Sequence, residues 1–241
     1  MMRASNAAFC ALLLMVPAIA SAGAVVFSNL GTSPVYDTSG GDFAGNGLDS
    51  SGNTYAEADT FTPTFNSKFS SLDIALSCAT FSSPPSKSPG AALGCFDTFT
   101  VALTSSSSDT PASVLESFTV AGTSLGANGS NNPLVVLNSA LTPTLTAGTQ
   151  YWITVTADLN DSIVWNWNNT VDSSDQGQSL DGGSTWFVSN PITGIGQTPG
   201  AYEVFGTVSG APEPTTAASL FLGALLLVVF RGRRGVSTLR K

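Results

Sequence analysis

Short runs in which apolar and polar residues alternate fill the middle of the chain. The alternation is clearest in residues 72–76, 99–103, 151–156 and 163–167. It is typical of β-strands that bury one face against a core. Shorter runs of the same kind predict further strands at residues 60–65, 115–120, 134–137, 185–188 and 201–208.

Glycine, proline, asparagine and serine separate these runs, and no long 3.6-residue period interrupts them before the C-terminal end. About nine short strands joined by turns favour two antiparallel sheets that bury their alternating faces. The sequence therefore predicts an all-β fold for residues 23–208, an antiparallel β-sandwich of jelly-roll-like kind that forms one domain.

The two ends have a different pattern, in which apolar residues follow one another without alternation. Residues 1–22 begin with a cation at Arg3, continue with an apolar stretch over 7–19 and end in small residues at 20–22. This order predicts a secretory signal peptide that signal peptidase removes. A retained N-terminal membrane anchor is the alternative, which Pro17 and the small residues disfavour.

The C-terminal pattern joins an extended motif, an apolar segment and a cluster of cations. Residues 215–230 carry no charge, and as a single transmembrane helix they would satisfy their own backbone groups. The segment is short, because a full span takes roughly 20 residues. The basic tail 231–241 holds the end on the cytoplasmic side. The membrane stop consists of Arg231, Arg233 and Arg234. Pro212 and Pro214 keep the backbone around Glu213 extended, which leaves it open to a processing enzyme.

With the motif Pro212-Glu213-Pro214 ahead of the apolar segment and the arginines, residues 209–241 resemble the PEP-CTERM sorting signal. That signal is found on exported proteins of Gram-negative bacteria that make extracellular polysaccharide. The resemblance implies recognition by exosortase, an integral-membrane protease that removes the tail. We therefore expect export across the inner membrane, anchoring by the helix, and then a place at the cell surface or in the extracellular matrix. A plain C-terminal membrane anchor is the alternative.

Charge is sparse in the chain, and in the part to be exported it is almost wholly negative. The formal net charge is −8, but Arg3 and the five C-terminal cations lie in the end segments. Lys68 and Lys87 are thus the only cations among sixteen acids. This balance repels nucleic acid and anionic lipid, which excludes both as partners. Serine, threonine, asparagine and glycine must supply the polar surface, which suits a hydrated extracellular matrix.

Cysteine usage fits an oxidising compartment. Cys10 lies in the signal peptide, so the exported part keeps Cys78 and Cys95. An even pair in an exported protein predicts a disulfide. The bond would close a loop of about 16 residues rich in turn formers, for which the chain-entropy model gives about 3 kcal/mol.

The sequence contains no histidine, which excludes Ser-His-Asp and Cys-His catalysis and histidine-ligated metals. A carboxylate pair as in glycosidases is an alternative, but acids such as Asp42 and Asp49 lie in turn-like contexts. We expect a protein that is not an enzyme and uses no cofactor. The candidates for a weak calcium site are Asp172, Asp175 and Asp181, whose oxygens suit Ca²⁺ but whose spacing matches no EF-hand. A hydrated turn is the alternative there.

The tryptophans have two interpretations. In a strand, Trp165 and Trp167 point to the same face, and together with Trp186 they would form a platform on which sugar rings stack. Packing in the core is the competing interpretation, because large aromatic residues dominate the interior of small sandwiches.

Residues 36–38, 145–152, 165–168 and 181–186 resemble the choice-of-anchor domains, especially the R type. These bacterial surface domains occur with different C-terminal anchors, and the resemblance implies no activity. The segment between the two cysteines is longer than in that pattern. Two classes of function therefore stay open. One is a non-catalytic structural or interaction protein of the cell surface or exopolysaccharide matrix, and the other is a carbohydrate-binding module that uses exposed tryptophans.

Overall fold

The computed structural model of the protein describes the middle of the chain, and this is the part predicted to be exported. The described residues are 23–46, 52–79, 95, 97–158, 161–170, 172, 174–189 and 198–208. The predicted signal peptide (1–22) and sorting tail (209–241) lie outside them. Within the described residues, no helix has the length and apolar character needed to cross a membrane.

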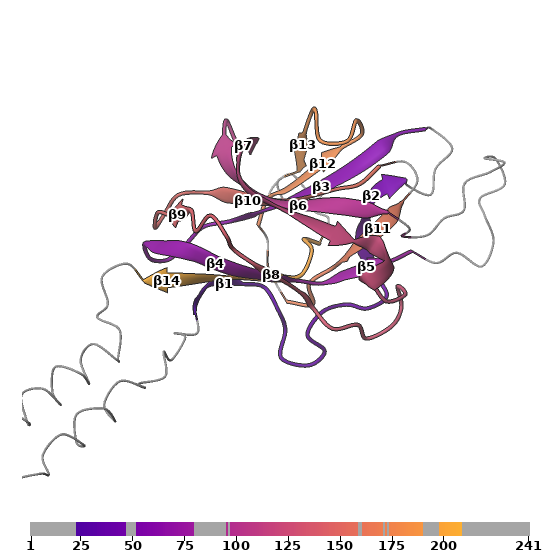
Figure 1. Ribbon diagram of the computed structural model, residues 1–241, viewed down its shortest axis with the longest axis horizontal. Helices are drawn as coiled ribbons and strands as arrows, with labels where there is room; N and C mark the ends of the chain where they lie inside the picture. Colours follow the sequence, from indigo (N-terminus) through magenta and orange to yellow (C-terminus); the bar gives the residue numbers. More distant parts are fainter. Residues whose placement is uncertain are drawn as a thin grey trace, which may run out of the picture. The chain divides into compact units, whose positions relative to one another are not determined.

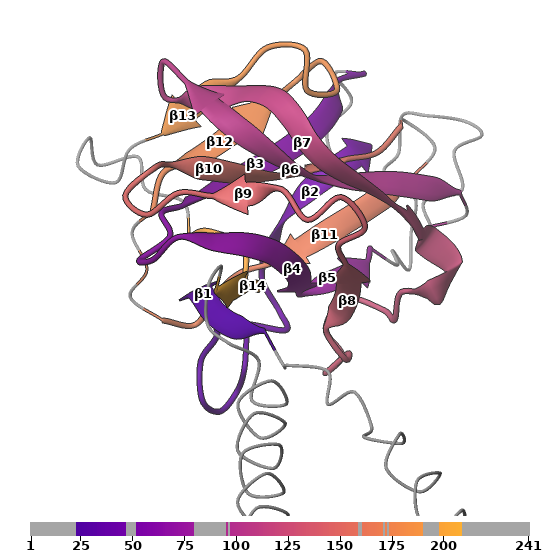
Figure 2. The ribbon, with the colours of Figure 1, turned by 60° about the vertical axis from the view of Figure 1, so that its left-hand side comes forward.

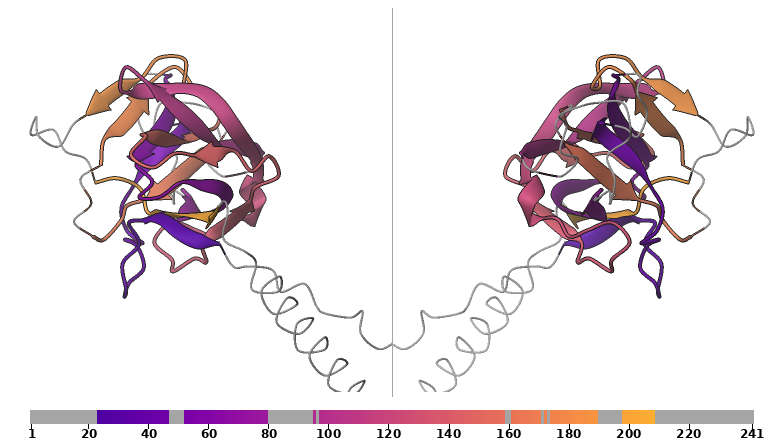
Figure 3. Two further views of the ribbon diagram at one scale, coloured as in Figure 1. Left: turned by 90° about the vertical axis from the view of Figure 1, so that its left-hand side faces the viewer. Right: turned by 90° about the vertical axis from the view of Figure 1, so that its right-hand side faces the viewer.

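Two antiparallel sheets form a β-sandwich, which confirms the all-β prediction (Figures 1 and 2). In the smaller sheet the strand order is β1 (Ala24–Ser28), β14 (Tyr202–Val208), β4 (Ser67–Ile74) and β8 (Val135–Asn138). The short strand β9 (Thr144–Leu145) also pairs with β4. Since β1 pairs with β14, the first and last strands lie side by side, in indigo and yellow in Figure 3.

The larger sheet is built around long central strands. Its order is β5 (Leu76–Cys78), β11 (Ser162–Asn166), β2 (Gly41–Asn46), β3 (Thr54–Phe61), β10 (Tyr151–Thr156), β6 (Thr98–Ser107) and β7 (Thr110–Ala121). The pair β12 (Gln176–Ser179) and β13 (Phe187–Ser189) adds to it, because β12 also pairs with β3. A single 3₁₀ turn, η1 (Gly122–Ser124), follows β7.

The core lies between the sheets and consists of the inward-facing residues of each strand. Val101 and Leu103 of β6 lie opposite Val155 and Ile153 of β10, and all four are fully buried. Aromatic rings close one region of the core. Phe61 stacks on Tyr151 at a centroid distance of 5.7 Å, and Trp165 meets Tyr202 edge-on at 5.6 Å. These contacts explain why alternating runs form the strands, since each run buries one row of side chains.

Most predicted strands are confirmed. The runs at 72–76, 99–103, 151–156 and 163–167 fall in β4 with β5, β6, β10 and β11. The strand expected at 60–65 was placed wrongly, because β3 runs from Thr54 to Phe61 and Pro63 follows it. The short or polar strands β1, β2, β9 and β12 were not predicted.

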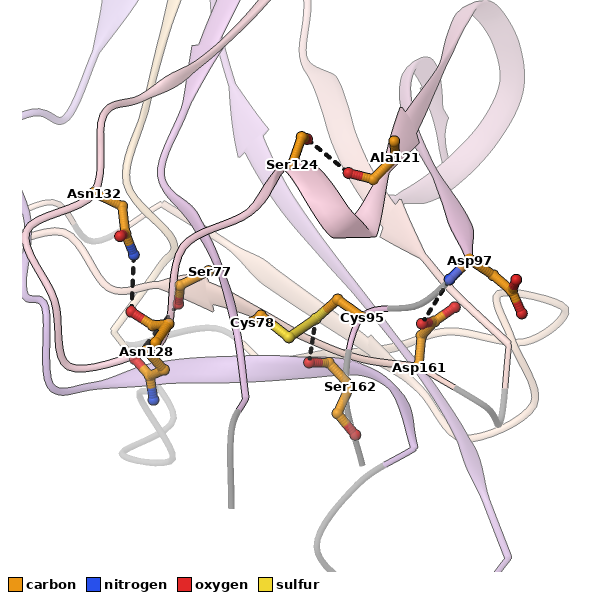
Figure 4. Close-up of a disulfide and its surroundings, with 11 residues drawn as sticks. Ser77, Cys78, Cys95, Asp97, Ala121, Ser124, Asn128, Asn132, Asp161 and Ser162 are labelled. Carbon is orange, nitrogen blue, oxygen red and sulfur yellow. Dashed lines mark hydrogen bonds between the residues drawn. A yellow bond between two sulfur atoms is a disulfide. The ribbon is translucent and has the colours of Figure 1, made fainter. Parts of the chain in front are cut away.

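The disulfide between Cys78 and Cys95 is present, which confirms that prediction (Figure 4). The two Cα atoms lie 5.7 Å apart, and the bond links β5 to the chain just before β6. Backbone hydrogen bonds hold Cys78 from its other side, since its N–H donates to the Gly126 carbonyl and its own carbonyl accepts from Asn128.

Candidate functional site

The sorting residues lie outside the described part of the chain. These are the motif Pro212, Glu213 and Pro214 and the membrane stop Arg231, Arg233 and Arg234. Their prediction therefore continues to rest on the sequence.

The tryptophans divide between the core and a partly covered surface. Trp165 is 1% exposed, belongs to the core and donates from Nε1 to the Ala201 carbonyl, as the core-packing interpretation expects. Trp167 is half-buried, and its Nε1 donates to Asp42. Trp186 is half-buried beside Gly177, where an added Cβ would lie 3.4 Å from its ring. Trp165 and Trp167 thus form no exposed platform.

The three aspartates suggested for calcium have separate roles. The exposed carboxylate of Asp181 accepts hydrogen bonds from Thr185 N (2.8 Å), Thr185 Oγ1 (2.7 Å) and Ser179 Oγ (2.7 Å), which lower its pKa to about 2. Asp172 accepts from Asn29 Nδ2 and from Ser174. The backbone carbonyl of Asp175 accepts from Thr60. The Asp181 carboxylate is fully used within its turn, which favours the hydrated-turn alternative there.

A different trio of acids converges next to the disulfide. Asp97, Asp158 and Asp161 each offer a carboxylate oxygen within 4.8 Å of the other two. Figure 4 shows Asp161 and Asp97 beside Cys95, with the Asp97 backbone N–H donating to Asp161 Oδ1 (3.3 Å). Two of the three acids are exposed, and exposed acids often gather without a ligand. The trio alone therefore identifies no function.

The most unusual feature is a group of acids inside the sandwich. Glu57 and Asp59 are two residues apart on β3, and each is only 1% exposed. They face inward, because their partners on β10 are the core residues Val155 and Ile153. Their neighbours on the other side, on β12, are Gln178 and Gln176.

Asp42 extends this acidic group onto β2. Its Oδ2 accepts hydrogen bonds from Trp167 Nε1 (2.8 Å) and from Gln176 Nε2 (2.7 Å). Gln178 Nε2 donates to Glu57 Oε1 (3.1 Å), and the Gly200 N–H donates to Asp59 Oδ2 (2.7 Å). We call Asp42, Glu57, Asp59 and Gln176 the interior acidic cluster.

Burying the three acids of this cluster as charged groups without a counter-ion would cost free energy of folding. Burial raises the pKa of Glu57 and of Asp59 well above the ordinary values, and their mutual repulsion and that of Asp42 raise the pKa of Glu57 further. Burial also raises the pKa of Asp42, despite its two hydrogen bonds. Lys68 is the one Lys or Arg in the described residues, and it is exposed and donates to Thr144. No basic side chain of the described domain therefore neutralises the cluster.

Sequence reasoning missed Glu57 and Asp59. The segment Ala56-Glu57-Ala58-Asp59 alternates, but an alternating acid is expected on the solvent face. The opposite face of β3 is covered as well, since Ala56 and Ala58 are fully buried. A usable signal was that residues 56–60 carry no large apolar residue on either face of the strand.

Comparison with known proteins adds no relative. No family model matches the chain, and no curated protein matches it. The resemblances to the PEP-CTERM signal and to the choice-of-anchor domains are therefore the basis of proposals only.

Proposed function

We propose that the protein is an exported, non-catalytic protein of the cell surface or exopolysaccharide matrix, sorted through its C-terminal tail. The observation that carries the proposal is the order of motif, uncharged apolar segment and arginines over residues 212–234. That order resembles the PEP-CTERM signal and implies an exosortase-type protease as partner, after signal peptidase has acted at the other end. The membrane is a partner through the helix expected at residues 215–230.

The described domain supports this proposal in two ways. A disulfide between Cys78 and Cys95 suits a protein that leaves the cytoplasm. The fold also suits a surface module. If β1, β3, β4, β6, β7, β8, β10 and β14 are numbered 1 to 8 in chain order, their orders in the two sheets are 1-8-3-6 and 2-7-4-5, which supports the jelly-roll type that we propose. Many unrelated functions use such a sandwich, so the fold alone assigns none of them.

A non-catalytic role is supported by where the acids lie. A glycosidase needs two carboxyl groups on either side of a cleft that admits the sugar. Glu57 and Asp59 are buried between the sheets instead, and Asp181 is used by its own turn. The sequence supplies no histidine for other hydrolytic arrangements.

Intact-mass spectrometry of the protein from its native host tests the sorting proposal. We expect a mature mass that lacks residues 1–22 and the tail beyond the motif. The triple variant Pro212→Ala, Glu213→Ala, Pro214→Ala should keep the tail and stay with the membrane fraction. Ser209→Ala, just ahead of the motif, is the matched control and should mature normally. A mass that includes both Met1 and Lys241 in the native protein rules the proposal out.

Carbohydrate binding remains a second candidate, now through Trp186 rather than the Trp165 and Trp167 pair. Trp186 is half-buried and its neighbour Phe187 is 63% exposed, so part of each aromatic ring is accessible near β13. Tryptophan fluorescence titrated with the host polysaccharide tests this candidate. Binding that Trp186→Ala abolishes and Val114→Ala preserves would support it. No fluorescence shift and no retention on the polymer would dismiss it.

A further inference from the structure

Three oxygens of the interior acidic cluster have no hydrogen-bond partner although they are buried. They are Glu57 Oε2, Asp59 Oδ1 and Gln176 Oε1, from side chains that are 1%, 1% and 3% exposed. Asp59 lies directly opposite Gln176 in the β3–β12 pair, and Glu57 lies two residues along the same face of β3. Buried polar atoms nearly always have a partner, so three open oxygens from one face of the paired strands β3 and β12 point to a ligand.

Protonation of the carboxylates is the competing explanation of these open oxygens. The second oxygen of each acid is already an acceptor, of Gln178 for Glu57 and of Gly200 for Asp59. A proton on Asp59 Oδ1 would find an acceptor in Gln176 Oε1 opposite it, but it would leave Glu57 Oε2 without a partner. A cation, by contrast, would use the free lone pairs of all three oxygens and offset the repulsion between the acids.

The donor set selects the kind of cation. Two carboxylates and an amide oxygen are hard ligands, with neither the imidazole nor the thiolate that zinc and copper prefer. Ca²⁺ accepts mixed oxygen ligands in irregular geometry, whereas Mg²⁺ requires a near-ideal octahedron.

We propose that Glu57, Asp59 and Gln176 bind a calcium ion between the two sheets, with Asp42 supplying further negative charge. The ion would join β3 to β12 directly and to β2 through the Gln176–Asp42 hydrogen bond (2.7 Å). Asp172 adds to the negative potential at the site, since its charge raises the pKa of Asp59. The site involves neither the sorting tail nor any polysaccharide. A failed calcium test would therefore leave the proposed function unaffected.

Thermal unfolding of the full-length, disulfide-bonded chain in mild detergent tests the site. Melting is followed at neutral pH in EGTA and in increasing CaCl₂. We expect a saturable rise in melting temperature. At a calcium concentration about ten times the dissociation constant, the unfolding equilibrium should shift roughly tenfold. The same concentrations of MgCl₂ should give a smaller shift, and equal shifts would overturn the calcium assignment.

Near-isosteric variants locate the ion. Glu57→Gln and Asp59→Asn should each abolish the calcium shift and, in EGTA, melt no lower than the native chain because repulsion is relieved. Asp73→Asn on β4 and Asp97→Asn in the trio beside the disulfide are matched controls and should keep the shift. A shift that Asp97→Asn removes and Asp59→Asn preserves would move the ion to the trio and overturn the proposal. No calcium shift in the native chain would overturn it too.

Terbium provides a readout that needs no variant of a ligand. Tb³⁺ replaces Ca²⁺ at oxygen sites and emits when a nearby tryptophan is excited. Trp167 is hydrogen-bonded to Asp42, so the terbium emission should be strong and should fall in Trp167→Phe. CaCl₂ should displace Tb³⁺ and abolish the emission. Emission that CaCl₂ does not displace would contradict a site shared with calcium.

Discussion

The buried acids of this protein differ in whether every carboxylate oxygen has a hydrogen-bond partner. Glu116 on β7 is buried, and its carboxylate accepts from Ser139 Oγ (2.5 Å), Ala140 N (2.6 Å) and Leu141 N (3.0 Å). Both of its oxygens are thus used, unlike those of Glu57 and Asp59. An acid of the first kind stabilises the fold, whereas an acid of the second kind costs stability until a ligand or a proton joins it.

Replacing Glu116 tests the first kind. Its carboxylate holds a tight loop in which Thr142 has φ of 46° and donates to Ser139. In Glu116→Ala, two backbone N–H groups lose their acceptor, so we expect a loss of about 1–3 kcal/mol in the free energy of unfolding. Urea unfolding measures it. Ser117→Ala, the exposed next residue of the strand, is the control, and an equal loss there would contradict the role of Glu116.

The pH dependence of Asp181 follows from its lowered pKa. Hydrogen bonds from Thr185 and Ser179 favour the charged form, so the pKa falls from 3.8 to about 2. A lowered pKa means that the stabilisation is present above pH 3.8 and is lost as the pH falls toward 2. NMR titration of the carboxyl carbon should show this value, and Thr185→Val should raise it. An unshifted pKa in the native chain would refute the turn geometry.

At the scale of strands, the sequence predicted those whose side chains divide cleanly between core and solvent. β6 and β10 show this, because their inward rows are Val101, Leu103, Ile153 and Val155. The prediction failed for β2 and β12, whose segments GDFAGN and QGQS carry glycine and polar residues. Their places depend on pairing with β3 and β11, which are distant in sequence. The interior acidic cluster was missed for the same reason, since its three strands β2, β3 and β12 meet only in the folded chain.

The disulfide acts on the segment between β5 and β6. Cys78 and Cys95 are 17 residues apart, and the chain-entropy model gives about 3 kcal/mol for a loop of this size. Cys78→Ala with Cys95→Ala should lower the free energy of unfolding by that amount in urea titrations. Dithiothreitol should lower the native value similarly and leave the double variant unchanged. A further effect of dithiothreitol on the double variant would mean that the loss has another cause.

At the scale of the whole chain, folding of the sandwich depends on its last strand. β14 lies between β1 and β4, so it is an inner strand of the smaller sheet. Gly206 in β14 lies so close to its neighbours that an added Cβ would be 2.7 Å from Val26 Cγ2. The strand ends at Val208, and the proposed sorting motif begins at Pro212. A cut at the motif would therefore spare every strand of the sandwich.

Truncation tests whether the tail is separable from the fold. Residues Gly23–Ser209 form one compact unit, so a chain that ends at Ser209 should unfold at the same urea midpoint as the full chain. A chain that ends at Ala201 lacks β14, loses Tyr202 and Val204 from the core and should not fold. Circular dichroism and urea unfolding distinguish the two. A lower midpoint for the chain ending at Ser209 would show that the tail stabilises the domain, and the proposed removal of the tail would then destabilise the domain instead of releasing it intact.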